Sequence, residues 1–132
     1  MSIERGRYLA LGPGACGACH TPTDNLFRPN GPALSGGTIP QPDETAADHE
    51  FVPPNLTPDS ATGQIAGWSE EQFVARFRQG RVYPGSRMPW ENFQRITEDD
   101  TRSLYRFLRS IPPVRHVIGP TYRKVGAKPN EQ

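Results

Sequence analysis

Two cysteines and a histidine lie together near the start of the chain, in the order Cys16-Gly17-Ala18-Cys19-His20. Thiols three positions apart, followed at once by an imidazole, form the pattern by which a c-type haem is attached. One turn of helix or loop places both sulfurs on the same side, so each can form a thioether to one vinyl group of a porphyrin. The next residue then lies under the ring, where its imidazole can bind the iron. The pattern therefore predicts one covalently attached haem, with His20 as an axial ligand.

The same short pattern has other interpretations, which the rest of the sequence helps to separate. A redox dithiol of the thioredoxin kind needs a βαβ pattern around the two cysteines, and none is visible. A structural zinc site needs four ligands, usually in two closely spaced pairs. The only other candidates are His49 and His116, which are isolated and far apart in the sequence. The sequence thus favours haem attachment, and a zinc-binding module, a redox dithiol or a plain pair of thiols are the alternatives.

A haem iron that is held by one histidine needs a second axial ligand, and the sequence offers Met88. It is the only methionine apart from Met1, and it lies in a loop that contains proline and glycine. Pro89 favours an extended backbone at the residue before it, which lets the Met88 side chain project from the loop. Thioether sulfur is a neutral, soft ligand that suits haem iron, although a methionine also commonly fills a gap in a core. We expect Met88 to be the second ligand, with His116 as a rival.

The composition indicates a chain that is short of core-forming side chains. Of its 132 residues 34% are hydrophobic, the mean hydropathy is −0.68, and 15 prolines and 13 glycines favour loops. This length suits one domain. A buried porphyrin would add a large flat apolar surface to the core. We therefore expect the protein to be largely unfolded without its haem.

The formal net charge of +1 argues neither for nucleic acid nor for a polybasic membrane-binding surface. No Lys or Arg lies between Arg28 and Arg76, whereas Lys and Arg predominate after Arg76. An acidic side and a basic side could orient the molecule against a redox partner, although an ordinary solvated surface explains the pattern equally well. Residues 43–50 are polar, and we expect this segment, His49 included, at the surface.

No stretch approaches the roughly 20 consecutive apolar residues of a membrane-spanning helix. The chain opens with Met1-Ser2-Ile3-Glu4-Arg5, which is not a secretory signal. Because covalent haem of this kind is attached outside the bacterial inner membrane, we expect a periplasmic protein whose signal or upstream segment is absent from this sequence. The alternative is one module of a longer chain.

Two features predict the structure of the N-terminal half. Residues 3–11 are expected to form a short helix, which Gly12-Pro13-Gly14 ends. Residues 21–67 contain eight prolines and no sustained periodicity. Irregular segments of this length are uncommon, and we expect this one to wrap an edge and a face of the flat cofactor.

Two further helices are expected in the second half. Ser69 and Gln72 form a capping box at the start of one helix, which Gly80 ends. The other helix begins at Thr97 with acidic residues in its first turn, carries an apolar stripe and stops at Pro112-Pro113. Most of the basic side chains lie off the apolar stripes.

Taken in order, these features resemble class I cytochrome c. More closely, the chain is similar to the haem domains of the cytochrome subunits of bacterial membrane alcohol and gluconate dehydrogenases. The similarity covers residues 4–114, and the stretches that carry it are Arg5–Ala10, Cys16–Pro22, Asn55–Asp59, Gly67–Ser69, Met88–Trp90, and Leu104–Ser110 with its Pro-Pro stop. Those subunits usually carry several haem motifs in tandem, whereas this sequence has one.

The resemblance implies an all-α fold, with three to four helices and long loops wrapped around one haem. It divides the chain into a cytochrome c domain at 1–114 and a basic C-terminal extension at 115–132. It also implies that Gly6 permits a close contact between the terminal helices, near Tyr105 or Leu108. The residues predicted to contact the cofactor are Cys16, Cys19, His20, Met88, Asn55, Trp68 and Trp90. Of these, His20 and Met88 are expected to bind the iron. Trp68 is either a core aromatic or a donor to a haem propionate.

The function implied is one-electron transfer within a respiratory chain, between a dehydrogenase or another cytochrome and a terminal acceptor such as an oxidase or reductase. The chain itself is then an electron carrier and not an enzyme. The alternative from another class is a haem enzyme or gas sensor with a displaceable sixth ligand. A peroxidase-like site needs a distal histidine or acid–base pair, and the loop around Met88 offers neither.

Overall fold

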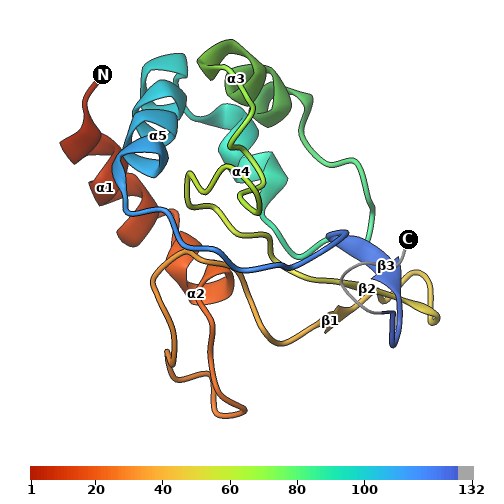
Figure 1. Cartoon of the computed structure of the whole chain (residues 1–132). Coiled ribbons are helices and arrows are strands. Elements are labelled where there is room, and N and C mark those ends of the chain that lie inside the picture. Colours follow the sequence, from red (N-terminus) through yellow and green to blue (C-terminus); the bar gives the residue numbers. More distant parts are fainter. Residues whose placement is uncertain (128–132) are drawn as a thin grey trace.

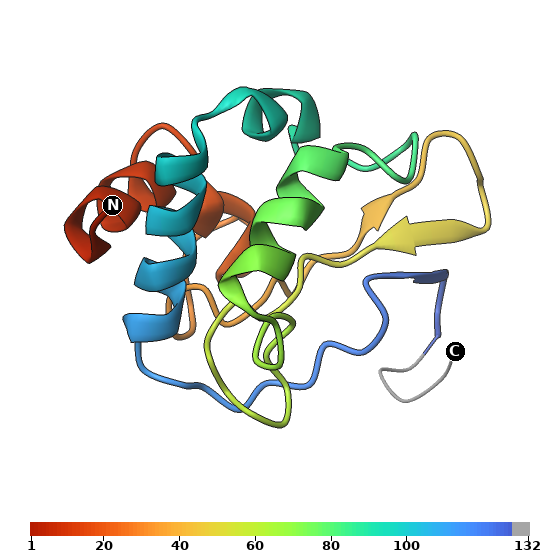
Figure 2. The ribbon, with the colours of Figure 1, turned by 90° about the horizontal axis from the view of Figure 1, so that it is seen from above.

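The structure is a computed structural model of the chain, and it describes residues 1–127 (Figure 1). The described residues form the helices α1 (Ile3–Leu11), α2 (Cys16–His20), α3 (Glu70–Gln79), α4 (Trp90–Arg95) and α5 (Glu98–Ser110), and the strands β1 (Gln41–Pro42), β2 (His49–Phe51) and β3 (Tyr122–Lys124). The helix α5 lies between α1 and α3, and the strands lie to one side of the helices (Figure 2). No helix in residues 1–127 combines the length and apolar character needed to cross a membrane.

The two terminal helices cross at Gly6, as the sequence predicted. A Cβ atom at Gly6 would overlap the backbone carbonyl oxygen of Ser103 and lie 2.7 Å from Cβ of Phe107. Only a residue without a side chain fits there. The contact lies at Ser103 and Phe107 on α5, not at Tyr105 or Leu108, because Tyr105 faces the α3 side, where its hydroxyl donates to the carbonyl of Trp68 at 2.6 Å.

The caps predicted for α3 and α5 are confirmed. Ser69 Oγ accepts a hydrogen bond from the backbone N–H of Gln72 at 3.1 Å, and Gln72 Oε1 accepts one from the N–H of Ser69 at 2.8 Å. Gly80 ends α3 with a φ of +76°, which favours glycine. Thr97 caps α5 by accepting from the N–H of Asp100 at 3.1 Å. These local signals fix both helix starts before any tertiary contact is considered.

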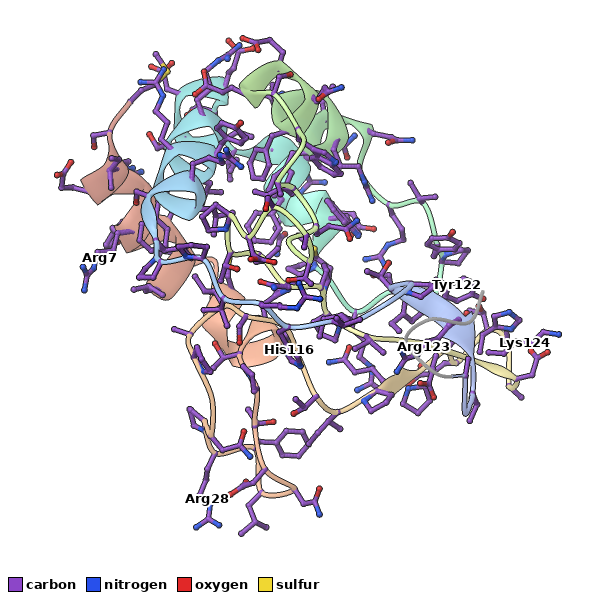
Figure 3. All side chains as sticks on the ribbon, in the orientation of Figure 1. Arg7, Arg28, His116, Tyr122, Arg123 and Lys124 are labelled. Atoms are coloured by element: carbon purple, nitrogen blue, oxygen red, sulfur yellow. The ribbon has the colours of Figure 1, made fainter. Side chains whose placement is uncertain are left out.

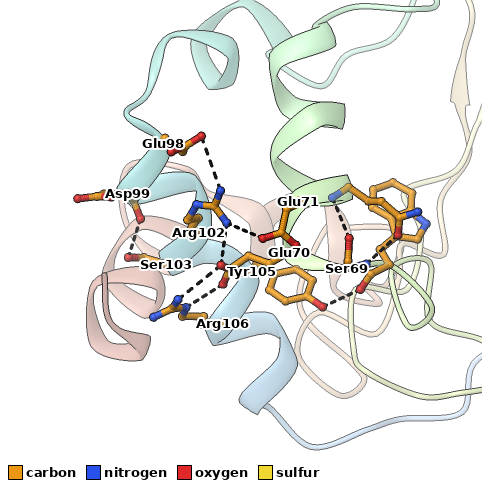
Figure 4. A network of polar contacts seen from close by, with 11 residues as sticks. Ser69, Glu70, Glu71, Glu98, Asp99, Arg102, Ser103, Tyr105 and Arg106 are labelled. Carbon is orange, nitrogen blue, oxygen red and sulfur yellow. Dashed lines mark hydrogen bonds and ion pairs between the residues drawn. The ribbon is translucent and has the colours of Figure 1, made fainter.

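Apolar and polar contacts together join α3 to α5. The buried core cluster consists of Ala10, Leu34, Ile65, Phe73, Phe77, Phe93, Leu104, Phe107 and Leu108. Beside it, Glu70 at the start of α3 accepts hydrogen bonds from Arg102 and Arg106 of α5, each at 2.8 Å (Figure 4). Hydrogen bonds from Arg106 first and Arg102 second lower the pKa of Glu70 below its ordinary value. The two helices are therefore held by a core on one side and a charged network on the other.

The all-α prediction is incomplete, because a three-stranded antiparallel sheet accompanies the helices. β2 pairs with β1 on one side and with β3 on the other, and β3 comes from the C-terminal segment. The prediction that residues 43–50 are exposed is wrong for two of them, since Asp43 is 4% and Glu50 7% exposed. The reason is that Tyr122 donates to Asp43 at 2.7 Å and Arg123 to Glu50 at 3.2 Å.

The helix α4, which was not predicted, follows the loop that carries Met88. It begins directly after Pro89 and has six residues, which is too short for a helical period to show in the sequence. Its Phe93 is buried in the core cluster. α4 thus anchors the C-terminal end of the loop that carries Met88.

Candidate cofactor site

The short helix α2 places both thiols and the imidazole of the motif. Gly14 donates to the carbonyl of Leu9 at 2.7 Å, which folds the chain back at the end of α1. Residues three apart on a helix lie on one face, so Cys16 and Cys19 share a side of α2. Both thiols are free, and Cys16 is half-buried against the core cluster whereas Cys19 is exposed. This arrangement is the one that two thioether bonds to one planar group require.

The orientation of His20 is fixed by a backbone group from a distant part of the chain. His20 is buried, with 8% of its surface exposed, and its Nδ1 lies 2.9 Å from the carbonyl oxygen of Pro54. A carbonyl can only accept, so Nδ1 carries the proton and the lone pair of the neutral ring is on Nε2. Burial lowers the pKa of His20, and the Pro54 carbonyl opposes this less strongly. The ring is therefore held in the neutral form, with its metal-binding nitrogen available.

The surroundings of Cys16 do not favour redox dithiol chemistry. Burial raises the pKa of Cys16 to about 11. A reactive dithiol needs the opposite shift, because the thiolate is the attacking species. At neutral pH Cys16 is a protonated thiol that lies against the core, which counts against the dithiol interpretation.

The described structure also gives no support to the zinc interpretation. Within residues 1–127, no group of three or more His, Cys, Asp or Glu side chains is placed to hold a metal ion. The two remaining histidines have other contacts. His49 Nδ1 lies 2.8 Å from Asp48, and His116 Nδ1 donates to the carbonyl of Ser35 at 2.7 Å.

Met88 lies in the segment 80–89 between α3 and α4. The side chain is half-buried and packs on the same core cluster as Cys16. Its backbone carbonyl accepts a hydrogen bond from Arg81 at 3.2 Å, and Arg81 also donates to the carbonyl of Ser86. Glu91 in α4 in turn holds the guanidinium of Arg81 by two contacts of 2.7 and 2.9 Å.

Sequence reasoning missed Arg81 and Glu91 as residues that support Met88. Their side chains bridge the two ends of the segment, because Arg81 follows α3 and Glu91 belongs to α4. The available signal was a pair of opposite charges on either side of a lone methionine in a loop.

The two tryptophans predicted at the site both lie against the core. Trp68 and Trp90 are half-buried and pack on the core cluster. Trp90 also has the guanidinium carbon of Arg76 3.7 Å from its ring centroid and meets Phe77 edge-on, with the ring centroids 5.7 Å apart. These contacts fix the indole of Trp90 in place. Contacts between either tryptophan and a cofactor stay predictions.

Asn55 is buried, and its amide joins two segments. With 1% of its surface exposed, it donates to the carbonyl of Val114 at 2.8 Å and to Thr62 at 3.1 Å. Its oxygen accepts from the backbone and the hydroxyl of Thr57 at 2.9 and 2.7 Å. Asn55 therefore ties the segment 55–62, which follows Pro54, to the C-terminal segment. A direct contact with a cofactor stays a prediction.

The donor set fits a covalently bound haem. It comprises two free thiols on one face of a helical turn, a neutral imidazole with an available Nε2, and a thioether. Four of the candidate site residues, Cys16, Trp68, Met88 and Trp90, are half-buried and border the core cluster, as do the apolar residues Leu56 and Ile96. The imidazole and the thioether are both ligands of haem iron, and the half-buried apolar side chains could pack against a flat apolar group.

Comparison with known proteins places the chain beside c-type cytochromes. It is 33% identical over 119 residues to the cytochrome c subunit of a quinone-type alcohol dehydrogenase from Gluconacetobacter polyoxogenes, a match that covers 85% of this chain and 25% of that protein. It is 33% identical over 123 residues to the fructose dehydrogenase cytochrome subunit of Gluconobacter japonicus, covering 86% of the chain and 22% of the relative. A diheme cytochrome c-type protein of Cereibacter sphaeroides is 32% identical over 117 residues, covering 84% of the chain and 36% of that protein.

The resemblance drawn from the sequence is thereby confirmed. The chain resembles a class I c-type cytochrome and, in particular, one haem domain of the cytochrome c subunits of bacterial dehydrogenases. It spans about a quarter of the length of the first curated relatives it matches. No protein-family model matches the chain.

Proposed function

We propose that this chain is a one-electron carrier with a single haem c, attached through Cys16 and Cys19 and ligated by His20 and Met88. The observation that carries the proposal is the 2.9 Å contact between His20 Nδ1 and the Pro54 carbonyl. His20 belongs to the same helical turn as the two free thiols. This contact selects the tautomer and orientation that an axial ligand needs. The similarity to cytochrome c subunits supports it.

Bound haem would supply an iron that alternates between the ferrous and ferric states, and the protein supplies the surroundings that make the exchange fast and reversible. The Pro54 carbonyl orients the imidazole. Arg81 and Glu91 hold the backbone at Met88, so the thioether stays in place in both states. His20 and Met88 would together hold the iron of such a haem and leave no position for a substrate, so little rearrangement of these residues would accompany each transfer.

The fold and setting follow from the same proposal. The order of α1, the CxxCH turn, the irregular segment, α3, the Met88 segment and α5 supports the proposed class I cytochrome c fold, beside which this chain has a small sheet. The relatives are named as subunits of dehydrogenases, so the partner we propose is a bacterial dehydrogenase or another cytochrome in the periplasm.

Optical spectroscopy tests the proposal on protein matured with the haem-loading machinery. A pyridine haemochrome assay should give one covalent haem per chain, and replacing Cys16 and Cys19 by Ala should abolish covalent attachment. The oxidised protein should show a weak near-infrared sulfur-to-iron band, which Met88→Ala removes while the covalent haem stays. The matched control is Met1→Leu, which should leave the band intact.

Three results would overturn the proposal. A colourless protein would exclude the haem. Survival of the near-infrared band in Met88→Ala would exclude the sixth ligand. Rapid binding of carbon monoxide to the reduced wild-type protein at neutral pH would instead indicate an open or displaceable site, as in a haem enzyme or gas sensor.

A further inference from the structure

Two segments of the chain have no part in the proposed electron transfer, and the structure pairs them with each other. They are the acidic segment 41–51 and the C-terminal segment 114–125. In the sheet, His49 of β2 lies opposite Lys124 of β3, and Phe51 lies opposite Tyr122. Tyr122, Arg123 and Lys124 follow one another on β3 (Figure 3).

An ion pair and backbone hydrogen bonds hold the two segments together. Glu50 and Arg123 form a buried ion pair at 3.2 Å, with 9% and 12% of their side chains exposed. Arg123 also donates to the carbonyl of Ile118 at 3.0 Å, and the N–H of Val52 donates to the carbonyl of Thr121 at 2.8 Å. A buried pair with additional hydrogen bonds holds one geometry, because separating it would leave an unpaired buried charge.

One side of this sheet packs against the segment that carries Met88. The ring of Tyr122 stacks on that of Tyr83, with centroids 4.3 Å apart and planes 27° from parallel. The ring of Phe51 meets that of Tyr83 edge-on, with the centroids 6.0 Å apart, and is tilted against that of Tyr122, with the centroids 4.7 Å apart. In Figure 1 the chain between α3 and α4 comes down to the sheet beside β3. Two aromatic rings of the sheet therefore contact Tyr83, which lies five residues before Met88.

Asp43 connects this aromatic contact to a second point on the same segment. Its carboxylate accepts from the hydroxyl of Tyr122 at 2.7 Å, which fixes the ring that stacks on Tyr83. A Cβ atom at Gly85 would overlap Oδ1 of Asp43 and lie 2.7 Å from its Cγ. The backbone at Gly85 thus lies directly against the carboxylate, three residues before Met88.

We propose that Asp43, Phe51 and Tyr122 form a clamp that fixes segment 80–89 and thereby positions the thioether of Met88. The consequence at the iron rests on the proposed function, whereas the clamp itself does not. A ten-residue connection has many conformations to lose, and a thioether is an uncharged, weak ligand that gains from being held in advance. Arg81 holds the segment from the helix side, and the clamp holds it from the sheet side. Tyr122 is a positioning residue in this scheme.

Hydrogen–deuterium exchange of the full-length holoprotein tests the clamp. Because an aromatic pair contributes about 0.5–1.5 kcal/mol, Tyr122→Ala should speed amide exchange in residues 82–88 about twofold to twelvefold. Exchange in α1 and α5 should be unchanged. Tyr122→Phe keeps the stacked ring and loses only the bond to Asp43, so it should restore most of the protection. The matched control is Tyr8→Ala, which removes an exposed tyrosine far from the clamp.

A double-mutant cycle tests the contact from the other side. Gly85→Ala introduces a methyl group that overlaps Asp43, so it should also speed exchange in residues 82–88. In an Asp43→Ala background the overlap is gone, and the added effect of Gly85→Ala should largely disappear. Equal effects of Gly85→Ala in both backgrounds would contradict the contact.

The outcomes separate this proposal from the proposed function. If Tyr122→Ala leaves exchange in residues 82–88 unchanged, or speeds it equally in α1 and α5, the clamp is wrong. If exchange in residues 82–88 is selectively faster, the clamp is supported whatever the near-infrared band shows, and loss of the Met88 ligand assignment would then count against the electron-carrier proposal alone. With both correct, the near-infrared band of Tyr122→Ala is lost at a lower temperature than in the wild type, and Tyr122→Phe recovers most of the difference.

Discussion

The guanidinium of Arg81 donates to the backbone carbonyl of Met88 at 3.2 Å while it pairs with both carboxylate oxygens of Glu91, at 2.7 and 2.9 Å. Arg81 lowers the pKa of Glu91 to about 2, so the pair stays charged throughout the physiological range. A planar guanidinium can make all these contacts simultaneously, because its N–H groups point in several fixed directions. A lysine ammonium cannot reproduce this geometry.

Arg81→Lys should therefore loosen Met88 without unfolding the protein. We expect the near-infrared band of the oxidised protein to be lost several degrees below its wild-type temperature, while the far-UV circular dichroism melt changes little. Arg87→Lys is the matched control, since Arg87 is exposed and its contact with Glu44 is 3.7 Å. Equal behaviour of the two variants would show that the charge of Arg81, and not its geometry, is sufficient.

The crossing of α1 and α5 should tolerate no side chain at Gly6. Gly6→Ala places a methyl group on the Ser103 carbonyl, and separating the helices should lower the free energy of unfolding by about 3 kcal/mol. Urea denaturation measures the change. Gly67→Ala is the control, because a Cβ there has no atom within 4 Å, and it should change stability by less than about 0.5 kcal/mol. A destabilisation of Gly67→Ala as large as that of Gly6→Ala would contradict the argument from packing.

The helices α1, α3 and α5 and their ends were predictable because their signals are local. The capping box of Ser69 and Gln72, the glycine at Gly80 and the cap at Thr97 each act within a few residues of the chain. The sheet was not predictable in the same way. Its strands are two or three residues long, and β2 finds its partner β3 more than 70 positions later, as the contact between Glu50 and Arg123 shows. No periodicity survives in such short strands.

The burial of Asp43 and Glu50 was missed for the same reason. A polar segment is expected at the surface unless partners for its charges are known, and these partners lie in the C-terminal segment. At the candidate site, the sequence was enough to propose the cysteines, His20 and Met88, because the chemistry of a side chain is visible in the sequence. It could not find the Pro54 carbonyl that orients His20, since every residue has a carbonyl and only the fold brings this one to Nδ1.

The network between α3 and α5 should make stability depend on pH through Glu70. Its pKa lies below the ordinary value of 4.5, because Arg106 and then Arg102 stabilise the charged carboxylate. A lowered folded-state pKa contributes stability at pH values above the ordinary one, and the contribution is lost as the pH falls through the lowered value. Glu70→Gln should therefore destabilise the protein at pH 7 by about 0.5 kcal/mol, a small effect because water screens the pair.

Thermal melts of wild type and Glu70→Gln from pH 7 downward measure this dependence. The difference in stability between wild type and Glu70→Gln should stay constant down to about pH 5 and shrink on further acidification. Glu71→Gln is the control in the same helical turn, where the side chain is 75% exposed. A difference that grows as the pH falls would have the wrong sign and would exclude the proposed role of Glu70.

The last prediction concerns the haem as part of the core. The buried apolar cluster is small, and the side chains that border it, including Cys16 and Met88, are only half-buried. Without a flat apolar group against them, these surfaces face water, and the loss of apolar burial is large against a stability of a few kcal/mol. The doubly substituted Cys16→Ala, Cys19→Ala protein, purified free of haem, should therefore show a largely unfolded far-UV circular dichroism spectrum at 25 °C. Met88→Ala, which keeps the covalent attachment, should retain a helical spectrum. A native-like spectrum with a cooperative melt in the haem-free protein would show that the chain folds on its own core.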